Sequence, residues 1–101
     1  MTKAYEFCPI CNKNIESVFI ENHHVIPTSK GGTVNDILRI CGTCHDTIHY
    51  FIPIEEIENY KTYHELASHP DMQIYIKWIE RKNNTGHWNI KKVLKNINKV
   101  A

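Results

Sequence analysis

The chain has 101 residues, of which 42% are hydrophobic, and a formal net charge of +1. That length is typical of one small domain, whose limited core often needs a metal ion or disulfides for stability. The composition excludes a uniformly basic nucleic-acid-binding protein, and no apolar stretch reaches the ~20 residues that a membrane-spanning helix needs.

The sequence of the N-terminal half predicts two short strands and a helix. Residues 17–24 alternate in hydrophobicity and predict a strand, and residues 37–41 predict a second strand after a loop that contains glycines. Residues 42–51 predict a helix. On that helix His45 and His49 are four positions apart, so we expect their side chains on the same face.

The C-terminal half predicts three helices. Pro53 suits the first turn of a helix over residues 54–67, and Pro70 suits the start of the next one. Gly86 is expected to cap the end of that second helix. The last helix has an apolar face and carries four lysines on its other side: Lys91, Lys92, Lys95 and Lys99. Residues 72–101 contain seven basic side chains and one acidic side chain, so this third of the chain is its basic end.

Four cysteines form a doubled C-x-x-C pattern with 29 residues between the two pairs. Each C-x-x-C loop lets two thiolates approach one ion, and two such loops make a closed tetrahedral zinc site. Two disulfides are the alternative. The N-terminus has no apolar run typical of a signal peptide, so we expect a cytoplasmic protein whose thiols stay reduced. We therefore predict one structural Zn²⁺ with four ligands: Cys8, Cys11, Cys41 and Cys44.

Two adjacent histidines, His23 and His24, lie at the end of the first predicted strand. Because neighbouring side chains in a strand point to opposite faces, one can face a metal ion while the other acts as a base. His45 and His49 either replace cysteines on the zinc or form a second, open metal site with His23. Glu21 shares the face of His23, and is either an exposed strand-end residue or a hydrogen-bond partner of a ligating imidazole.

The segment ENHHVIPTSKGG (residues 21–32), followed by NDILRICGTCHDTIH (residues 35–49), resembles the HNH endonucleases of the ββα-metal class. The resemblance covers residues 8–49. It implies an α+β fold, with a small ββα-metal core and a zinc knuckle of four cysteines, followed by about three C-terminal helices. We accordingly expect a zinc-stabilised nuclease core at residues 1–52 and a helical extension at residues 53–101, packed on the core and basic at its C-terminal end.

The resemblance implies metal-dependent hydrolysis of phosphodiester bonds in DNA, with His24 as the general base that activates a water molecule. Three histidines correspond to ligands of a catalytic divalent ion, which could be Mg²⁺, Mn²⁺, Ni²⁺ or Zn²⁺: His23, His45 and His49. The asparagine at the centre of the family's motif falls on Asp36 here, with Asn35 beside it. Either residue could therefore brace the loop that holds the base.

Lys30 in the loop and Arg39 in the second strand are candidate phosphate contacts, together with the lysines of the last helix. Each of these could instead be an ordinary solvated charge. A non-catalytic zinc-dependent DNA-binding module is an alternative, although it does not need the histidine set. A subunit of a phage packaging or defence complex, in a bacterial or phage-infected cell, is a third reading, and both a protein partner and a homodimer stay open.

Overall fold

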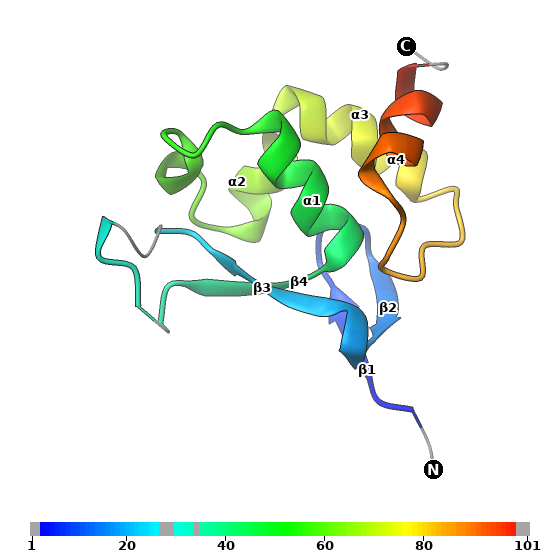
Figure 1. Cartoon of the computed structure of the whole chain (residues 1–101), viewed down its shortest axis with the longest axis horizontal. Coiled ribbons are helices and arrows are strands. Elements are labelled where there is room, and N and C mark those ends of the chain that lie inside the picture. The colour runs from blue at the N-terminus through cyan, green and yellow to red at the C-terminus, as the bar shows by residue number, and fades with distance from the viewer. Residues whose placement is uncertain (1–2, 27–29, 34, 99–101) are drawn as a thin grey trace.

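The computed structural model describes residues 3–26, 30–33 and 35–98, which form two small antiparallel sheets and four α-helices (Figure 1). This arrangement confirms the expected α+β fold. The elements in chain order are β1 Tyr5–Cys8, β2 Lys13–Glu16, the 3-10 turn η1 Ser17–Phe19, β3 Ile20–His24, β4 Ile37–Cys41, α1 Gly42–Phe51, the 3-10 turn η3 Ile57–Asn59, α2 Tyr63–Ser68, α3 Pro70–Ile79 and α4 Ile90–Asn98.

The first sheet is a hairpin that carries two of the cysteines, one at the end of β1 and one in the turn. β1 pairs with β2 so that Cys8 lies opposite Lys13, and Cys11 belongs to the connecting turn. Asn12 closes this turn with a φ of 57° and donates its backbone N–H to the carbonyl of Cys8 at 2.8 Å. Asparagine is among the residues that tolerate this left-handed conformation best, so the local sequence suits the knuckle.

The second sheet carries the paired histidines. β3 and β4 are antiparallel, with His23 opposite Leu38 and His24 opposite Ile37. The expected strand over residues 17–24 is too long, because residues 17–19 form the turn η1 and the strand begins only at Ile20. β4 and α1 follow one another directly and have the predicted bounds, and α1 lies across the β3–β4 ribbon (Figure 1).

The expected helix over residues 54–67 is wrong. Its first half forms turns and η3, and the helix α2 begins only at Tyr63. Thr62 is extended and its hydroxyl oxygen accepts a hydrogen bond from the backbone N–H of Glu65 at 3.1 Å, so an N-cap starts a new helix there. Residues 54–59 lack a helical apolar stripe, and Ile57 is their buried side chain.

The other two C-terminal helices match the expectation. α3 begins at Pro70 and buries Met72, Tyr75 and Ile79, and it packs against α1. α4 buries Val93 and Ile97 and exposes three of the predicted lysines, and the fourth, Lys99, lies outside the described residues. Of the helices in the described ranges, none combines the length and the apolarity needed to cross a membrane.

The expected capping role of Gly86 is wrong, because α3 already ends at Ile79. Gly86 has a φ of 96°, and a Cβ atom there would lie 2.6 Å from Cγ2 of Ile15. Its carbonyl accepts the backbone N–H of Thr43 at 3.0 Å. The glycine is therefore needed for close approach: it lets the loop after α3 press against β2 and the first turn of α1.

Candidate functional site

The four cysteines converge from both ends of the N-terminal half, and each is fully buried. The Sγ atoms of Cys8 and Cys44 are 3.8 Å apart, and those of Cys11 and Cys41 are 4.0 Å apart. A disulfide needs about 2.05 Å, so the cysteines are free thiols. Zinc–sulfur bonds of about 2.3 Å place ligand sulfurs about 3.8 Å apart in a tetrahedron, so this set fits one zinc ion.

The electrostatics of the sulfur cluster favour a bound cation. Hydrogen bonding from the neighbouring cysteines, Cys11 first, lowers the pKa of Cys8 far below its usual range, which favours a thiolate. Burial raises the pKa of Cys44, because a second isolated negative charge is costly in the interior. A divalent cation among the four sulfurs is what would allow all of them to ionise together.

A second convergence is made by three histidines from β3 and α1. Their ring centroids are 4.7 to 5.5 Å apart, and one nitrogen from each lies within 4.8 Å of the others. The Nε2 atoms of His45 and His49 are 3.0 Å apart. His23 is fully buried, and neither of its ring nitrogens has a hydrogen-bond partner among the described residues. An orphaned buried imidazole that faces two others fits a metal ligand, since unpaired buried polar groups are otherwise rare.

Two of these imidazoles are held neutral near pH 7, which is the state a ligand needs. Burial, reinforced by His45, His49 and His24, lowers the pKa of His23 to about 4. Burial and the adjacent His45 also lower the pKa of His49. The fold itself thus keeps the lone pairs of these two rings free to bind a cation.

Glu21 orients one of these rings. Its Oε1 atom lies 2.7 Å from Nδ1 of His45, so a proton on Nδ1 leaves the lone pair on Nε2, the atom that faces His49. A carboxylate that fixes the tautomer in this way is common behind metal-binding histidines. Glu21 is therefore a hydrogen-bond partner of His45, which is the second of its two expected roles. Its side chain is still 49% exposed.

His24 does not belong to the three-histidine cluster, although it is next to His23 in β3. It is half-buried and lies on the opposite face of the strand from His23. Asp36 holds the loop that returns to β4: its carboxylate accepts from the backbone N–H and hydroxyl of Thr33, and its carbonyl accepts from Val25, next to His24. Within the described ranges, the side chains of Asp36 and Asn35 form no hydrogen bond to His24.

The predicted phosphate contacts differ in availability. Lys30 pairs with Glu58 at 3.3 Å. Arg39 donates to both carboxylate oxygens of Glu6, at 3.0 and 2.8 Å, and to Asn22, so most of its donors are occupied. This contact lowers the pKa of Glu6. In contrast, three lysines of α4 are exposed and form no salt bridge within the described part of the chain: Lys91, Lys92 and Lys95.

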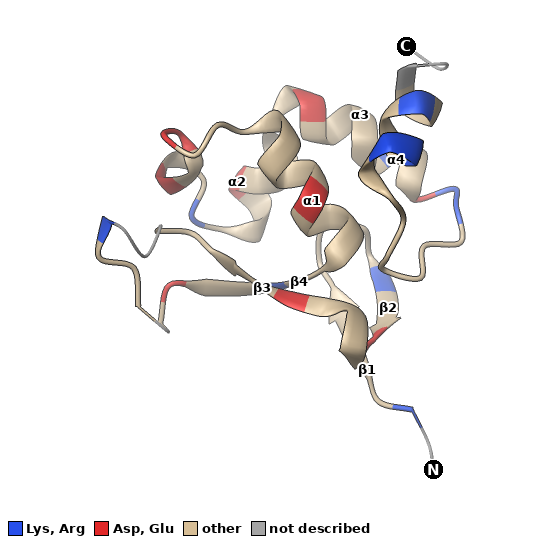
Figure 2. Cartoon of the chain, in the orientation of Figure 1, with Lys and Arg blue, Asp and Glu red and all other residues tan. Residues whose placement is uncertain are grey.

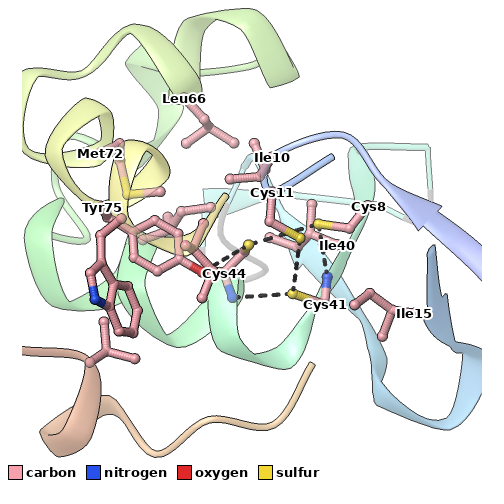
Figure 3. Close-up of a cluster of buried hydrophobic side chains, with 14 of the residues drawn as sticks. Cys8, Ile10, Cys11, Ile15, Ile40, Cys41, Cys44, Leu66, Met72 and Tyr75 are labelled. Carbon is pink, nitrogen blue, oxygen red and sulfur yellow. Dashed lines mark hydrogen bonds between the residues drawn. The ribbon is translucent and has the colours of Figure 1, made fainter. Parts of the chain in front are cut away.

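Two residues that contact the sulfur cluster were not predicted from the sequence. Tyr75 of α3 has its hydroxyl 3.1 Å from Sγ of Cys44 (Figure 3), and Asn84 directs its amide toward Cys11 and Cys41. Tyr75 falls within an ordinary apolar helix stripe. Asn84 is separated from its sulfur partners by 73 and 43 residues, so no local pattern in the sequence could have identified either residue.

Comparisons with known proteins agree with the geometry. A family model described as HNH endonuclease matches residues 8–60. The chain is 29% identical over 76 residues to the uncharacterized protein YisB of Bacillus subtilis (strain 168), a match that covers 74% of each chain. No solved structure matches the chain.

Proposed function

The chain belongs to the HNH endonuclease family, and from that premise we propose that it is a metal-dependent enzyme that hydrolyses phosphodiester bonds in DNA. The observation that carries the proposal is the three-histidine cluster, with its buried and unpartnered His23. A protein that only binds DNA does not need such a cluster, which argues against the non-catalytic alternative. In this proposal residues 1–52 form the nuclease core, and residues 53–101 form an extension that supports it.

In the proposed site, His23, His45 and His49 would hold one divalent ion, and Glu21 keeps the ring of His45 in the required tautomer. The bound ion would supply electrostatic polarisation of the scissile phosphate and stabilise the leaving oxygen. The four cysteines form a separate, closed centre that would hold a structural Zn²⁺. The two centres share α1, which contributes Cys44 to one and the ligands His45 and His49 to the other.

His24 would act as the general base. An imidazole nitrogen of neutral His24 accepts a proton from the attacking water, and the ring then carries the positive charge. His24 is adjacent in sequence to His23, so the proton acceptor and a metal ligand are fixed on one short strand. Asp36, through its backbone contact with Val25, holds the loop beside the base. This is the bracing role we assign to it, and Asn35 has no such contact among the described residues.

The proposal is tested by incubating supercoiled plasmid with purified protein in Mg²⁺, Mn²⁺, Ni²⁺ or EDTA. Nicked or linear DNA is expected with at least one of these ions and not with EDTA. The double variant His45→Ala/His49→Ala, which keeps the cysteine cluster and His24, should be inactive. Cleavage that persists in EDTA, or equally in the double variant, would contradict the proposal.

A hollow surface runs from the basic helix to Glu21, the hydrogen-bond partner of His45. It consists of two adjoining hollows that share residues 87–89. The larger one has a volume of about 590 Å³ and is also lined by Lys91 and Lys92. The smaller one has a volume of about 310 Å³ and is also lined by Glu21 and Asp46. Figure 2 shows the basic segments of α4 on the side of the molecule away from the acidic turns before α2. We propose that the DNA backbone follows this surface, with its phosphates near the lysines.

Replacing Lys91 and Lys92 with glutamine is expected to weaken DNA binding and flatten its salt dependence. Each lost phosphate contact reduces the slope of log affinity against log salt by about 0.9, so the double variant should lose up to about 1.8. The measurement is fluorescence anisotropy with labelled duplex DNA at several salt concentrations, in buffer without chelator and without added divalent ions, so that the DNA stays uncut and the structural zinc is retained.

A matched control removes two exposed lysines that lie outside both hollows, in the variant Lys61→Gln/Lys77→Gln. The total charge change is the same, so an unspecific effect of net charge would appear equally in both variants. If the two slopes fall by the same amount, or neither falls, the lysines of α4 do not contact the DNA backbone.

A further inference from the structure

We propose that Tyr75 and Asn84 are positioning residues of the cysteine centre, through hydrogen bonds that they donate to the zinc-bound sulfurs. Both residues lie beyond residues 8–60, the part that the HNH family model matches. This inference rests on the proposed structural zinc. It assigns to the helical extension a direct role in holding the metal, in addition to covering the core.

The argument begins with charge. Four thiolates around one Zn²⁺ leave a net charge of −2, buried among side chains that are themselves inaccessible to water. Such a charge is costly unless hydrogen-bond donors surround it. The backbone supplies part of this need: the N–H of Cys41 lies 3.4 Å from Sγ of Cys8, and the N–H of Cys44 lies 3.5 Å from Sγ of Cys41. In the described residues these two bonds leave Cys11 and Cys44 without a backbone donor.

The extension supplies donors to both remaining sulfurs. The hydroxyl of Tyr75, a fully buried side chain, lies 3.1 Å from Sγ of Cys44 (Figure 3). A zinc-bound thiolate has no proton to give, so the hydroxyl must be the donor. Nδ2 of Asn84 lies 3.2 Å from Sγ of Cys11 and 3.5 Å from Sγ of Cys41. Together with the backbone, these two side chains give every sulfur at least one donor.

The orientation of the Asn84 amide is fixed by its other end. Oδ1 accepts the backbone N–H of Gly86 at 2.9 Å, so the NH₂ group must face the sulfurs. Gly86 is itself held by its contact with Thr43 and by its close approach to Ile15. Asn84 is 5% exposed, so water competes little for its amide. The loop after α3 thus presents a pre-oriented donor to the metal centre.

The test uses the full chain loaded with zinc and two variants, Tyr75→Phe and Asn84→Asp. Tyr75→Phe removes only the hydroxyl, and Asn84→Asp keeps the acceptor for Gly86 but replaces the donor with a carboxylate. Each should release zinc to a chromogenic chelator faster than the wild type, by about 10-fold or more, because partners of metal ligands typically change affinity 10- to 100-fold. The controls Tyr63→Phe and Asn96→Asp alter side chains that bond only to backbone groups elsewhere.

A spectroscopic measurement separates hydrogen bonding from general loosening of the fold. With Co²⁺ in place of zinc, loss of a donor raises electron density on sulfur, so the sulfur-to-cobalt charge-transfer band should move to lower energy in both variants and in neither control. Zinc release and bands equal to the wild type in both variants would overturn this inference alone. Wild-type protein that binds neither zinc nor cobalt would contradict the zinc centre itself, and this inference with it.

Discussion

Replacing Cys41 with serine is expected to leave the chain unfolded at room temperature. A structural zinc contributes on the order of 10 kcal/mol to folding, and a small domain has a total stability of only about 5–15 kcal/mol. Cys41 ends β4, and its sulfur caps the first turn of α1, so the loss of this ligand also disturbs the helix that carries His45 and His49. Circular dichroism and thermal unfolding, with metal analysis of the purified protein, measure the effect.

The control for this variant is Ile40→Val, which changes the neighbouring fully buried residue without touching the sulfurs. That substitution should cost about 0.5–1.5 kcal/mol and leave a cooperative transition. If Cys41→Ser unfolds cooperatively at the temperature of the wild type, or if the wild type is folded after its zinc has been removed, the cysteine centre does not stabilise the fold by binding metal.

Replacing His24 with alanine is expected to reduce the single-turnover rate of DNA cleavage by about 10²–10⁴-fold, because removal of a general base typically has that effect. The loss should persist at saturating metal, since a higher ion concentration does not replace a positioned proton acceptor. The measurement is the rate of plasmid nicking at increasing concentrations of the activating ion.

His64→Ala is the matched control for His24→Ala, because His64 is exposed on α2 and contacts neither metal centre. This control should cleave at the wild-type rate. Cleavage by His24→Ala at the rate of the control would show that another group takes the proton, and rescue of His24→Ala by excess metal would show that His24 acts through the ion.

Much of the N-terminal half could be predicted because its signals are local. The doubled C-x-x-C requires the two ends of the segment to meet, and the bounds of β4 and α1 follow from the periodicity between them. The spacing of His45 and His49 predicts a shared helix face, and the alternation along a strand predicts that His23 and His24 diverge. The convergence of three imidazoles is a consequence of these local features.

The rest depends on contacts between distant residues. Lys30 and Arg39 are basic in sequence, yet each has an acidic partner, Glu58 or Glu6, that only the folded chain brings near. The helix expected over residues 54–67 is an exception, because a local signal explains its failure: Thr62 caps a new helix through the backbone N–H of Glu65 and outweighs the proline upstream. Asn84 reaches the cysteines only because Gly86 allows its loop to approach β2, and no local spacing encodes that contact.

The central claim is that the adjacent histidines have different roles, with His23 on the metal and His24 on the proton. Calorimetric titration of the activating ion into zinc-loaded wild type, His23→Ala and His24→Ala tests it most directly. The account predicts that His24→Ala binds the ion with the affinity and stoichiometry of the wild type, whereas His23→Ala, which lacks the buried ligand, binds much more weakly. Unchanged affinity in His23→Ala, or loss of binding in His24→Ala alone, would contradict the account.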